Sequence, residues 1–365
     1  MARSNDDADR NVEAEDQQTG DKHQTEHEEP DAKRTKTEKQ PSREGEGDDS
    51  KREDGHSDHE THHQNGAHKA ASKSKSGAAE RPGDEPDVPS SILEKGIIYF
   101  FIRGRVNVEE PHKVDDIART FILLRPIATD AKLGSGPLSD AGTTRVLALP
   151  KKQLPMSGRE RFMAFVDMAG ASYDEIKGSF LASSDYETKT AGTRHTPAAT
   201  PVGEGVYAIT TTGRESHLAY MTTLPKELGE VQKKLGIKDQ GSFILSTKNP
   251  EYPGPANARL PKGPEFPKKL QEEFRSLRWM PSRPNHLDYV NAQVLLVGES
   301  SGIDKAVEQQ KEDEKDGAEE PMEALEHLED EDLNRMSDLA GDQSASIFAD
   351  LHAQAKDYPS IQTTF

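Results

Sequence analysis

The first 91 residues contain no Ile, Leu, Phe, Trp or Tyr, and this constrains the fold more than any other feature of the sequence. Ordering each residue costs about 1–2 kcal/mol of backbone entropy, which buried apolar surface has to offset. Residues 1–89 also carry 24 acidic and 14 basic side chains, for a net charge of −10. We therefore expect 1–89 to be a disordered, acidic, low-complexity arm.

Two short motifs lie in this arm. Imidazole is a good ligand for zinc, copper or nickel, but we favour the alternative that the histidine cluster is a solvated polar tract that binds metal only adventitiously. The basic run Lys33–Lys36 has the composition of a weak nuclear localisation signal, but short basic runs are also common in disordered tails. No metal site is assigned here. The clustered histidines are His56, His59, His62, His63 and His68.

Apolar residues return at Ile92, in short runs that are rich in β-branched and aromatic side chains and bounded by Gly, Pro or Asp. This pattern is typical of strands and predicts a mainly β core over 90–302. Helices are expected only at Tyr173–Phe180, Pro225–Leu235 and Phe266–Trp279, the second ending at Gly236. The predicted strands are 96–106, 118–127, 144–154, 161–170, 205–213, 217–225, 241–250 and 292–300.

The eight predicted strands form two similar sets, over about 94–172 and 203–300. Gly96 in the first set corresponds to Gly205 in the second, and Pro126 to Pro225. Lys151 corresponds in the same way to Lys248. A chance match among strand-forming residues remains the alternative. A tandem duplication predicts two β-meanders packed about a pseudo-twofold axis, as an antiparallel barrel or sandwich that leaves few exposed strand edges.

The sequence after the core is acidic again. Residues 303–341 have 15 acidic and 4 basic side chains, whereas 90–302 have a net charge of +4. Helical spacing places one apolar stripe on a predicted acidic helix at about 321–340, and this stripe docks either on the core or on a partner. Residues 342–365 are expected to be a flexible tail with a short interaction motif. The expected partner-binding residues are Met322, Leu325, Leu328, Leu333, Met336, Leu339, Ile347, Phe348 and Leu351.

Several classes of function are disfavoured by what the sequence lacks. The chain has no Cys, which excludes disulfides, zinc–thiolate sites and cysteine nucleophiles. No run approaches the roughly 18 apolar residues needed to span a membrane, so we expect a soluble intracellular protein of the nucleus or cytoplasm. Familiar phosphate-loop, nucleophile-elbow, zinc-protease and dinucleotide signatures are also missing. No cofactor is expected, and the sequence leans away from an enzyme.

The loop 185–205 is the one stretch that suggests chemistry. Arg194 is suited to clamp an anion, and His195 with Glu204 is suited to form an acid–base pair. The alternative is a plain connection between the two sets of strands, kept extended by Pro197 and Pro201. Glu204 would then occupy a tight turn between two glycines.

Basic side chains of the core form a second candidate group. Arg103 and Arg105 are two residues apart in a predicted strand, so their side chains lie on the same face. Lys151 and Lys248 occupy corresponding positions if the duplication holds. Together they predict a shared cleft for an anion. Ordinary surface charge is the alternative, and a net charge of +4 over 90–302 is too small to favour nucleic-acid binding.

The pattern GEGVYAI, HLAYMTTLP, GSFILSTKNP and LLVGES resembles a family common in filamentous fungi, whose members are often labelled "BTB domain transcription factor". Shorter bacterial relatives keep the β core. The resemblance covers about 90–302, implies a role in transcription, and supplies no catalytic residues.

These patterns favour a non-enzymatic interaction protein whose acidic arms bind basic proteins or peptides, or mask its own core, in transcription or chromatin. The alternative is a small-molecule-binding or enzymatic β barrel with its site at the 185–205 loop. The sequence leaves the oligomeric state open.

Overall fold

Eight antiparallel strands pair edge to edge until the last one meets the first. The computed structural model describes residues 79–80, 88–190, 192–254, 260–339 and 344–365. All of them belong to the second of the two units into which the chain divides, Ala71–Phe365. The predicted disordered arm 1–89, with its histidine cluster and its basic run, therefore lies outside the described residues except at 79–80 and 88–89.

The eight predicted strands all form, and five short strands accompany them. The strands are β1 (Ala79–Glu80), β2 (Ile92–Gly104), β3 (Ile117–Ile127), β4 (Lys132–Leu133), β5 (Thr144–Leu149), β6 (Arg161–Ala171), β7 (Ser184–Thr188), β8 (Gly192–Thr196), β9 (Ala199–Thr211), β10 (Ser216–Leu224), β11 (Gln240–Lys248), β12 (Trp279–Pro281) and β13 (Gln293–Gly298).

Helices are short except for one. The α-helices are α1 (Tyr173–Glu175), α2 (Glu230–Leu235), α3 (Lys268–Glu273), α4 (Lys311–Asp316), α5 (Pro321–Asp338) and α6 (Ala345–Asp350). A π-helical segment, η2 (Ile176–Leu181), follows α1, and 3-10 turns are η1 (Val114–Asp116), η4 (Pro284–Asp288) and η5 (Ala355–Asp357).

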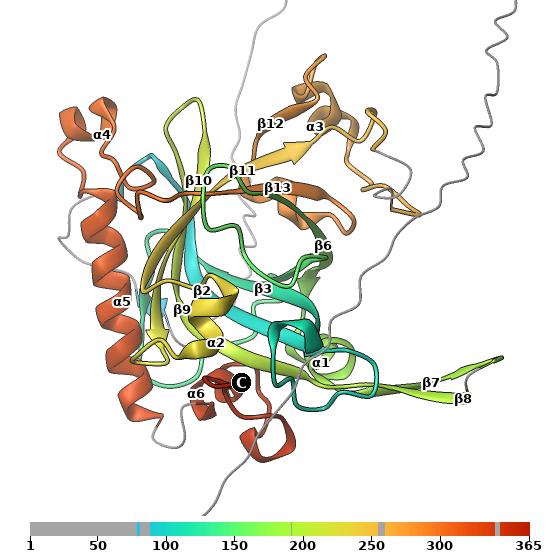
Figure 1. Ribbon diagram of the computed structural model, residues 1–365. Coiled ribbons are helices and arrows are strands. Elements are labelled where there is room, and N and C mark those ends of the chain that lie inside the picture. The colour runs from blue at the N-terminus through green and yellow to red at the C-terminus, as the bar shows by residue number, and fades with distance from the viewer. Residues whose placement is uncertain (1–78, 81–87, 191, 255–259, 340–343) are drawn as a thin grey trace, which may run out of the picture. The chain divides into compact units, whose positions relative to one another are not determined.

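The hydrogen-bonded order β10-β9-β2-β3-β5-β6-β13-β11 closes into a ring, because β10 also pairs with β11. The predicted mainly β, antiparallel fold is thus confirmed as a closed barrel, to which β12 adds beside β11 (Figure 1). Two four-stranded meanders make up the ring, β2-β3-β5-β6 and β9-β10-β11-β13. Their first strands pair with each other, and so do their last strands, which gives the predicted pseudo-twofold arrangement.

Two glycines occupy equivalent places in the two meanders. A Cβ added at Gly96 would lie 2.0 Å from the carbonyl oxygen of Arg125, and one added at Gly205 would lie 2.0 Å from that of Met221. Both positions need glycine because the neighbouring strand approaches this closely. Gly96 pairs with Pro126 and Gly205 with Thr222, so Pro126 corresponds to Thr222 and not to Pro225. Common ancestry of the meanders remains a prediction.

Residues of alternating orientation build two separate cores. One cluster takes side chains from all eight strands of the ring and fills its interior, where Tyr220 contacts Phe100 and Phe243. The other lies on the outer face of the sheet, where β2, β3, β9 and β10 are covered by η2, α5 and α6. The barrel is therefore apolar on both sides over much of its wall, which explains why its strands read as nearly continuous apolar runs.

The predicted acidic helix forms as α5 and docks on the chain's own barrel, against β9 and β10 (Figure 1). Leu325 and Leu328 are buried, Met322, Met336 and Leu339 are partly buried, and Leu333 is exposed. The structure thus decides between the two docking alternatives, because most of the apolar stripe is already covered within the chain.

The segment 342–365 differs from the expected flexible tail. From residue 344 onward it forms α6 and η5, and Ile347, Phe348 and Leu351 are completely buried in the outer core. These three side chains pack inside the chain and do not form an exposed interaction motif. The last residues are held as well, because Val231 donates a backbone hydrogen bond to Thr363.

The loop 185–205 is not a simple connection. Its first part forms a two-stranded ribbon, β7–β8, that projects from the barrel, and its second part begins β9 at Ala199 (Figure 1). Gly203, Glu204 and Gly205 lie within β9 and are buried, so the predicted tight turn at Glu204 is wrong. The glycines there serve close strand packing.

Replacing Gly205 by alanine tests the close approach of β9 and β10. The added Cβ overlaps the Met221 carbonyl, so we expect Gly205→Ala to lower the free energy of unfolding by about 1–3 kcal/mol or more. Gly178→Ala is the control, because no atom outside its chain neighbours and its own helix backbone lies within 4 Å of that Cβ. A urea midpoint that falls equally in both variants, or in neither, would contradict this packing.

Candidate functional site

The predicted basic cleft does not form, and the pseudo-twofold arrangement explains why. Because β2 and β9 are antiparallel, equivalent strands of the two meanders run in opposite directions along the barrel. Lys151 follows β5 at one end of the barrel, where β2 ends and β9 begins. We call this end of the barrel the ribbon end. Lys248 finishes β11 at the opposite end, which we call the α3 end. Corresponding lysines therefore lie at opposite ends.

The three basic side chains at the ribbon end have separate surroundings. Arg103 is half-buried beside the rings of Phe121 and Phe180 and donates hydrogen bonds to the carbonyls of Pro197 (3.1 Å) and Phe180. Burial lowers the pKa of Arg103, which Asp167 counteracts. Arg105 is exposed, and exposed Lys151 lies over the ring of Phe162. Arg103 thus has a structural role.

His195 lies at the base of the β7–β8 ribbon between two carboxylates. Its Nδ1 is 2.6 Å from Asp185 and its Nε2 is 2.7 Å from Glu109. Carboxylates accept hydrogen bonds, so the ring donates to both only as the imidazolium. The backbone of His195 also pairs with Asn107 in both directions. His195 therefore anchors the ribbon to the segment after β2, while Arg194 points outward beside Tyr186 in the register of the ribbon.

Glu204, the expected partner of His195, lies instead in the outer core under the C-terminal helices. It is completely buried, and its Oε1 accepts a hydrogen bond from Nη2 of Arg335 at 3.2 Å. Arg335, on α5, also donates to Asp332 (2.5 Å) and to Asp350 of α6 (2.6 Å). One guanidinium thus joins three carboxylates, from β9, α5 and α6. We call these four side chains the Arg335 cluster.

Neighbouring polar groups complete the Arg335 cluster. Tyr99 of β2 donates to Asp350 at 2.8 Å, and Thr223 of β10 donates to Asp332 at 2.9 Å. The backbone N–H of Leu138 donates to Asp350, and Ser346 donates to Glu204. The cluster is satisfied by hydrogen bonds from several elements, as a buried charged group requires.

The charges in the Arg335 cluster do not cancel, because three carboxyl groups surround one guanidinium. Burial, followed by the charges of Asp332 and Asp350, raises the pKa of Glu204 well above its ordinary value. Burial also raises the pKa of Asp332. Burial by itself would lower the pKa of Arg335, but the three carboxylates raise it. Burial and mutual repulsion therefore favour the protonated form of Glu204 and Asp332, whereas the arginine is held in its charged form.

The outward side of α4 and α5 is a surface of carboxylates, which we call the acidic face. Among the described side chains of α4 and α5, the exposed basic ones are Lys311, Lys315 and His327. Burial and the charges of Asp330 and Glu326 raise the pKa of Glu329, so like charges already repel one another there. A cationic partner would relieve that repulsion. The exposed carboxylates are Glu312, Glu314, Glu320, Glu323, Glu326 and Asp330.

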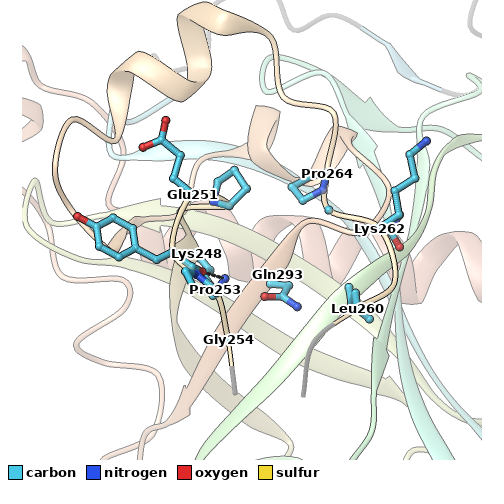
Figure 2. Close-up of a pocket in the computed structure, with 12 residues that line it drawn as sticks. Lys248, Glu251, Pro253, Gly254, Leu260, Lys262, Pro264 and Gln293 are labelled. Carbon is cyan, nitrogen blue, oxygen red and sulfur yellow. Dashed lines mark hydrogen bonds between the residues drawn. The ribbon is translucent and has the colours of Figure 1, made fainter. Parts of the chain in front are cut away.

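Lys248 lies in the wall of a cavity of about 260 Å³ at the α3 end (Figure 2). Its ammonium donates to the carbonyl of Tyr252 at 2.5 Å, and Lys248 is largely buried. Gln293 and Lys262 add polar groups to a lining that includes Leu260 and several prolines. Lys248 is thus a predicted anion-binding residue that lines a cavity.

The sequence did not reveal the Arg335 cluster, although one signal was present. Asp332 and Arg335 follow Leu325 and Leu328 at helical spacing, so they lie on the face of α5 that packs on the barrel. A lone arginine on the buried face of an acidic helix indicates a buried ion pair. Its partner Glu204 is 131 positions away in sequence, and Asp350 lies in the next helix, so no helical spacing connects them.

No family model, curated protein or solved structure matches this chain. The resemblance to the fungal proteins labelled as BTB transcription factors therefore stays a prediction.

Among the described residues, no group of three or more His, Cys, Asp or Glu side chains is arranged to hold a metal ion. In the same part of the chain, no helix combines the length and apolar character that crossing a membrane requires.

The raised pKa of Glu204 predicts how stability depends on pH. The pKa of this carboxyl is higher in the folded state than in the unfolded state, where it is about 4.5. Its contribution to stability is therefore fully present at pH values below the unfolded-state pKa. That contribution is lost as the pH rises toward the folded-state pKa. Glu204→Gln removes the titration and keeps an oxygen for Arg335. We expect the melting temperature of the wild type to fall more steeply between pH 5 and pH 9 than that of Glu204→Gln. Parallel profiles would show that Glu204 does not titrate in this range.

Proposed function

We propose that this protein is a non-enzymatic interaction protein whose acidic face binds a basic protein or peptide. The observation that carries the proposal is the outward arrangement of carboxylates on α5, whose apolar side is already occupied by the barrel. What the helix offers to a partner is therefore negative charge. Lysine- and arginine-rich segments, such as the tails of chromatin proteins, have the complementary chemistry.

Three further features support this proposal. The barrel interior is filled by side chains such as Phe100, Tyr220 and Phe243, which is typical of a scaffold. The carboxylates sit on a helix fixed by the Arg335 cluster, so little entropy is lost when a partner binds. The sequence of 1–89 adds a net charge of −10 that attracts the same class of partner. We place this role in transcription or chromatin, in the nucleus or cytoplasm.

The alternative, a ligand-binding or enzymatic barrel with its site at 185–205, has less support. Arg194 faces outward, His195 is held between two carboxylates, and Glu204 is buried beneath α5 and α6. These three side chains do not face a common cavity. A small-anion site at Lys248 would be separate from them.

Binding of fluorescein-labelled decalysine to the full chain tests the proposal. We expect the dissociation constant to increase at least tenfold between 50 and 300 mM NaCl, because exposed charge contacts are screened by salt. The triple substitution Glu323→Gln, Glu326→Gln and Asp330→Asn should weaken binding by about threefold or more, since each exposed charge contact contributes roughly 0.2–1 kcal/mol.

The control is Glu251→Gln, Glu265→Gln and Glu272→Gln, which changes the net charge equally at exposed positions near the α3 end. It should have a clearly smaller effect than the α5 variant. Equal weakening by both variants would mean that decalysine responds only to net charge, and this would contradict a role for the acidic face.

A further inference from the structure

Leu277 is the most exposed large hydrophobic side chain among the described residues, with 53% of its surface accessible. It lies in the segment 275–278 between α3 and β12. Figure 1 shows these two elements side by side at the α3 end of the barrel. Exposed leucines are common, so exposure alone does not indicate a binding site. The backbone that presents this leucine adds the first independent observation.

The segment around Leu277 is fixed by hydrogen bonds to three successive carbonyls. The hydroxyl of Tyr252 donates to Ser276 (2.8 Å), the side-chain amide of Asn249 to Leu277 (3.1 Å), and the backbone N–H of Asn249 to Arg278 (3.0 Å). Leu277 itself donates its N–H to Phe274 at 2.8 Å. The leucine is therefore presented by a rigid turn, which lowers the entropy lost when a partner covers it.

Arg275 shows that this turn is held against a local preference. Its φ of 50° lies in the left-handed region, where a residue with a side chain is disfavoured by roughly 1–2 kcal/mol and glycine is the usual occupant. The conformation turns the chain sharply after α3 and brings Leu277 to the surface. Backbone strain of this kind is concentrated at functional positions.

Leu277 forms one side of an open groove of about 440 Å³, together with Met280. The rim carries the cations Lys269, Arg275 and Arg283 and the carboxylates Glu272 and Glu273. Glu273 pairs with Arg283 at 3.2 Å, and Glu272 lies 3.8 Å from Lys268 outside the groove. Exposed Lys269 and Arg275 therefore give the rim a net positive charge. An apolar floor with a mainly cationic rim is complementary to an acidic peptide that carries a bulky apolar side chain.

We propose that this groove, formed by Leu277 and Met280 between the cations of α3 and Arg275, binds an acidic peptide segment of a partner through one buried apolar side chain. The partner's Leu or Phe packs on Leu277 and Met280. Its flanking carboxylates pair with Lys269 and Arg275. This surface lies on α3 and β12, outside the acidic face on α5, so it binds partners of the opposite charge.

Fluorescence anisotropy with short labelled peptides tests this site on the full chain. At 50 mM NaCl we expect the peptide Glu-Glu-Leu-Phe-Glu-Glu to bind, and Glu-Glu-Ser-Ser-Glu-Glu to bind at least fivefold more weakly because it lacks the apolar anchor. Leu277→Ser and Lys269→Glu should each weaken the first peptide by at least fivefold.

Val290→Ser is the matched control, because Val290 is almost as exposed as Leu277 and lies outside the groove. It should leave the affinity unchanged. Absence of binding up to 1 mM peptide, equal binding of both acidic peptides, or insensitivity to Leu277→Ser would overturn the proposal. Tighter binding of a decathymidine oligonucleotide than of the leucine-containing peptide would also overturn it, since the site would then recognise phosphates.

Discussion

The completely buried guanidinium of Arg335 is the interaction on which the arrangement of the C-terminal half depends. It joins Asp332 of its own helix and Asp350 of the following helix α6 to Glu204 of the barrel, which is more than one hundred positions away in sequence. A buried ion pair contributes little net stability when it is complete, but removing one partner leaves uncompensated charge and costs about 3–5 kcal/mol. The cluster therefore specifies where α5 and α6 lie.

This placement determines which surfaces are left for partners. The apolar side of α5 and the side chains of Ile347, Phe348 and Leu351 cover the outer face of the barrel, so they do not serve as external docking motifs. The polar side of α5 is exposed as a consequence, with its carboxylates turned outward. The chain thereby separates charge, with acidic residues on α5 and exposed cations around α3. Both proposed binding surfaces follow from this separation.

Local patterns were sufficient to predict the strands but not the contacts between distant segments. The apolar runs after Ile92 predicted all eight barrel strands, and Gly96 and Gly205 correctly indicated two similar meanders, because these signals depend on neighbouring residues. Glu204 was misplaced in a turn, since glycine pairs mark both turns and close strand packing. The β7–β8 ribbon was missed because its residues are polar except for Tyr186 and Gly192, so no apolar run marks it.

The predicted basic cleft failed for a reason that lies in the topology. Equivalent lysines of an antiparallel pseudo-twofold pair lie at opposite ends of the barrel, and sequence similarity alone does not show direction. The tail was predicted to be flexible because its few apolar residues form no long pattern. Burial of Ile347 and Phe348 depends on a barrel surface that is made by residues more than one hundred positions away.

Hydrogen–deuterium exchange of Arg335→Met tests most directly whether the Arg335 cluster holds the C-terminal helices. Methionine fills similar space and leaves Glu204, Asp332 and Asp350 without their cation. We expect amides of α5 and α6 to exchange at least about 100-fold faster than in the wild type, since every 1.4 kcal/mol corresponds to a factor of ten. Amides of β5 and β6 should keep most of their protection. Unchanged protection of α5 and α6 would contradict the central role of Arg335.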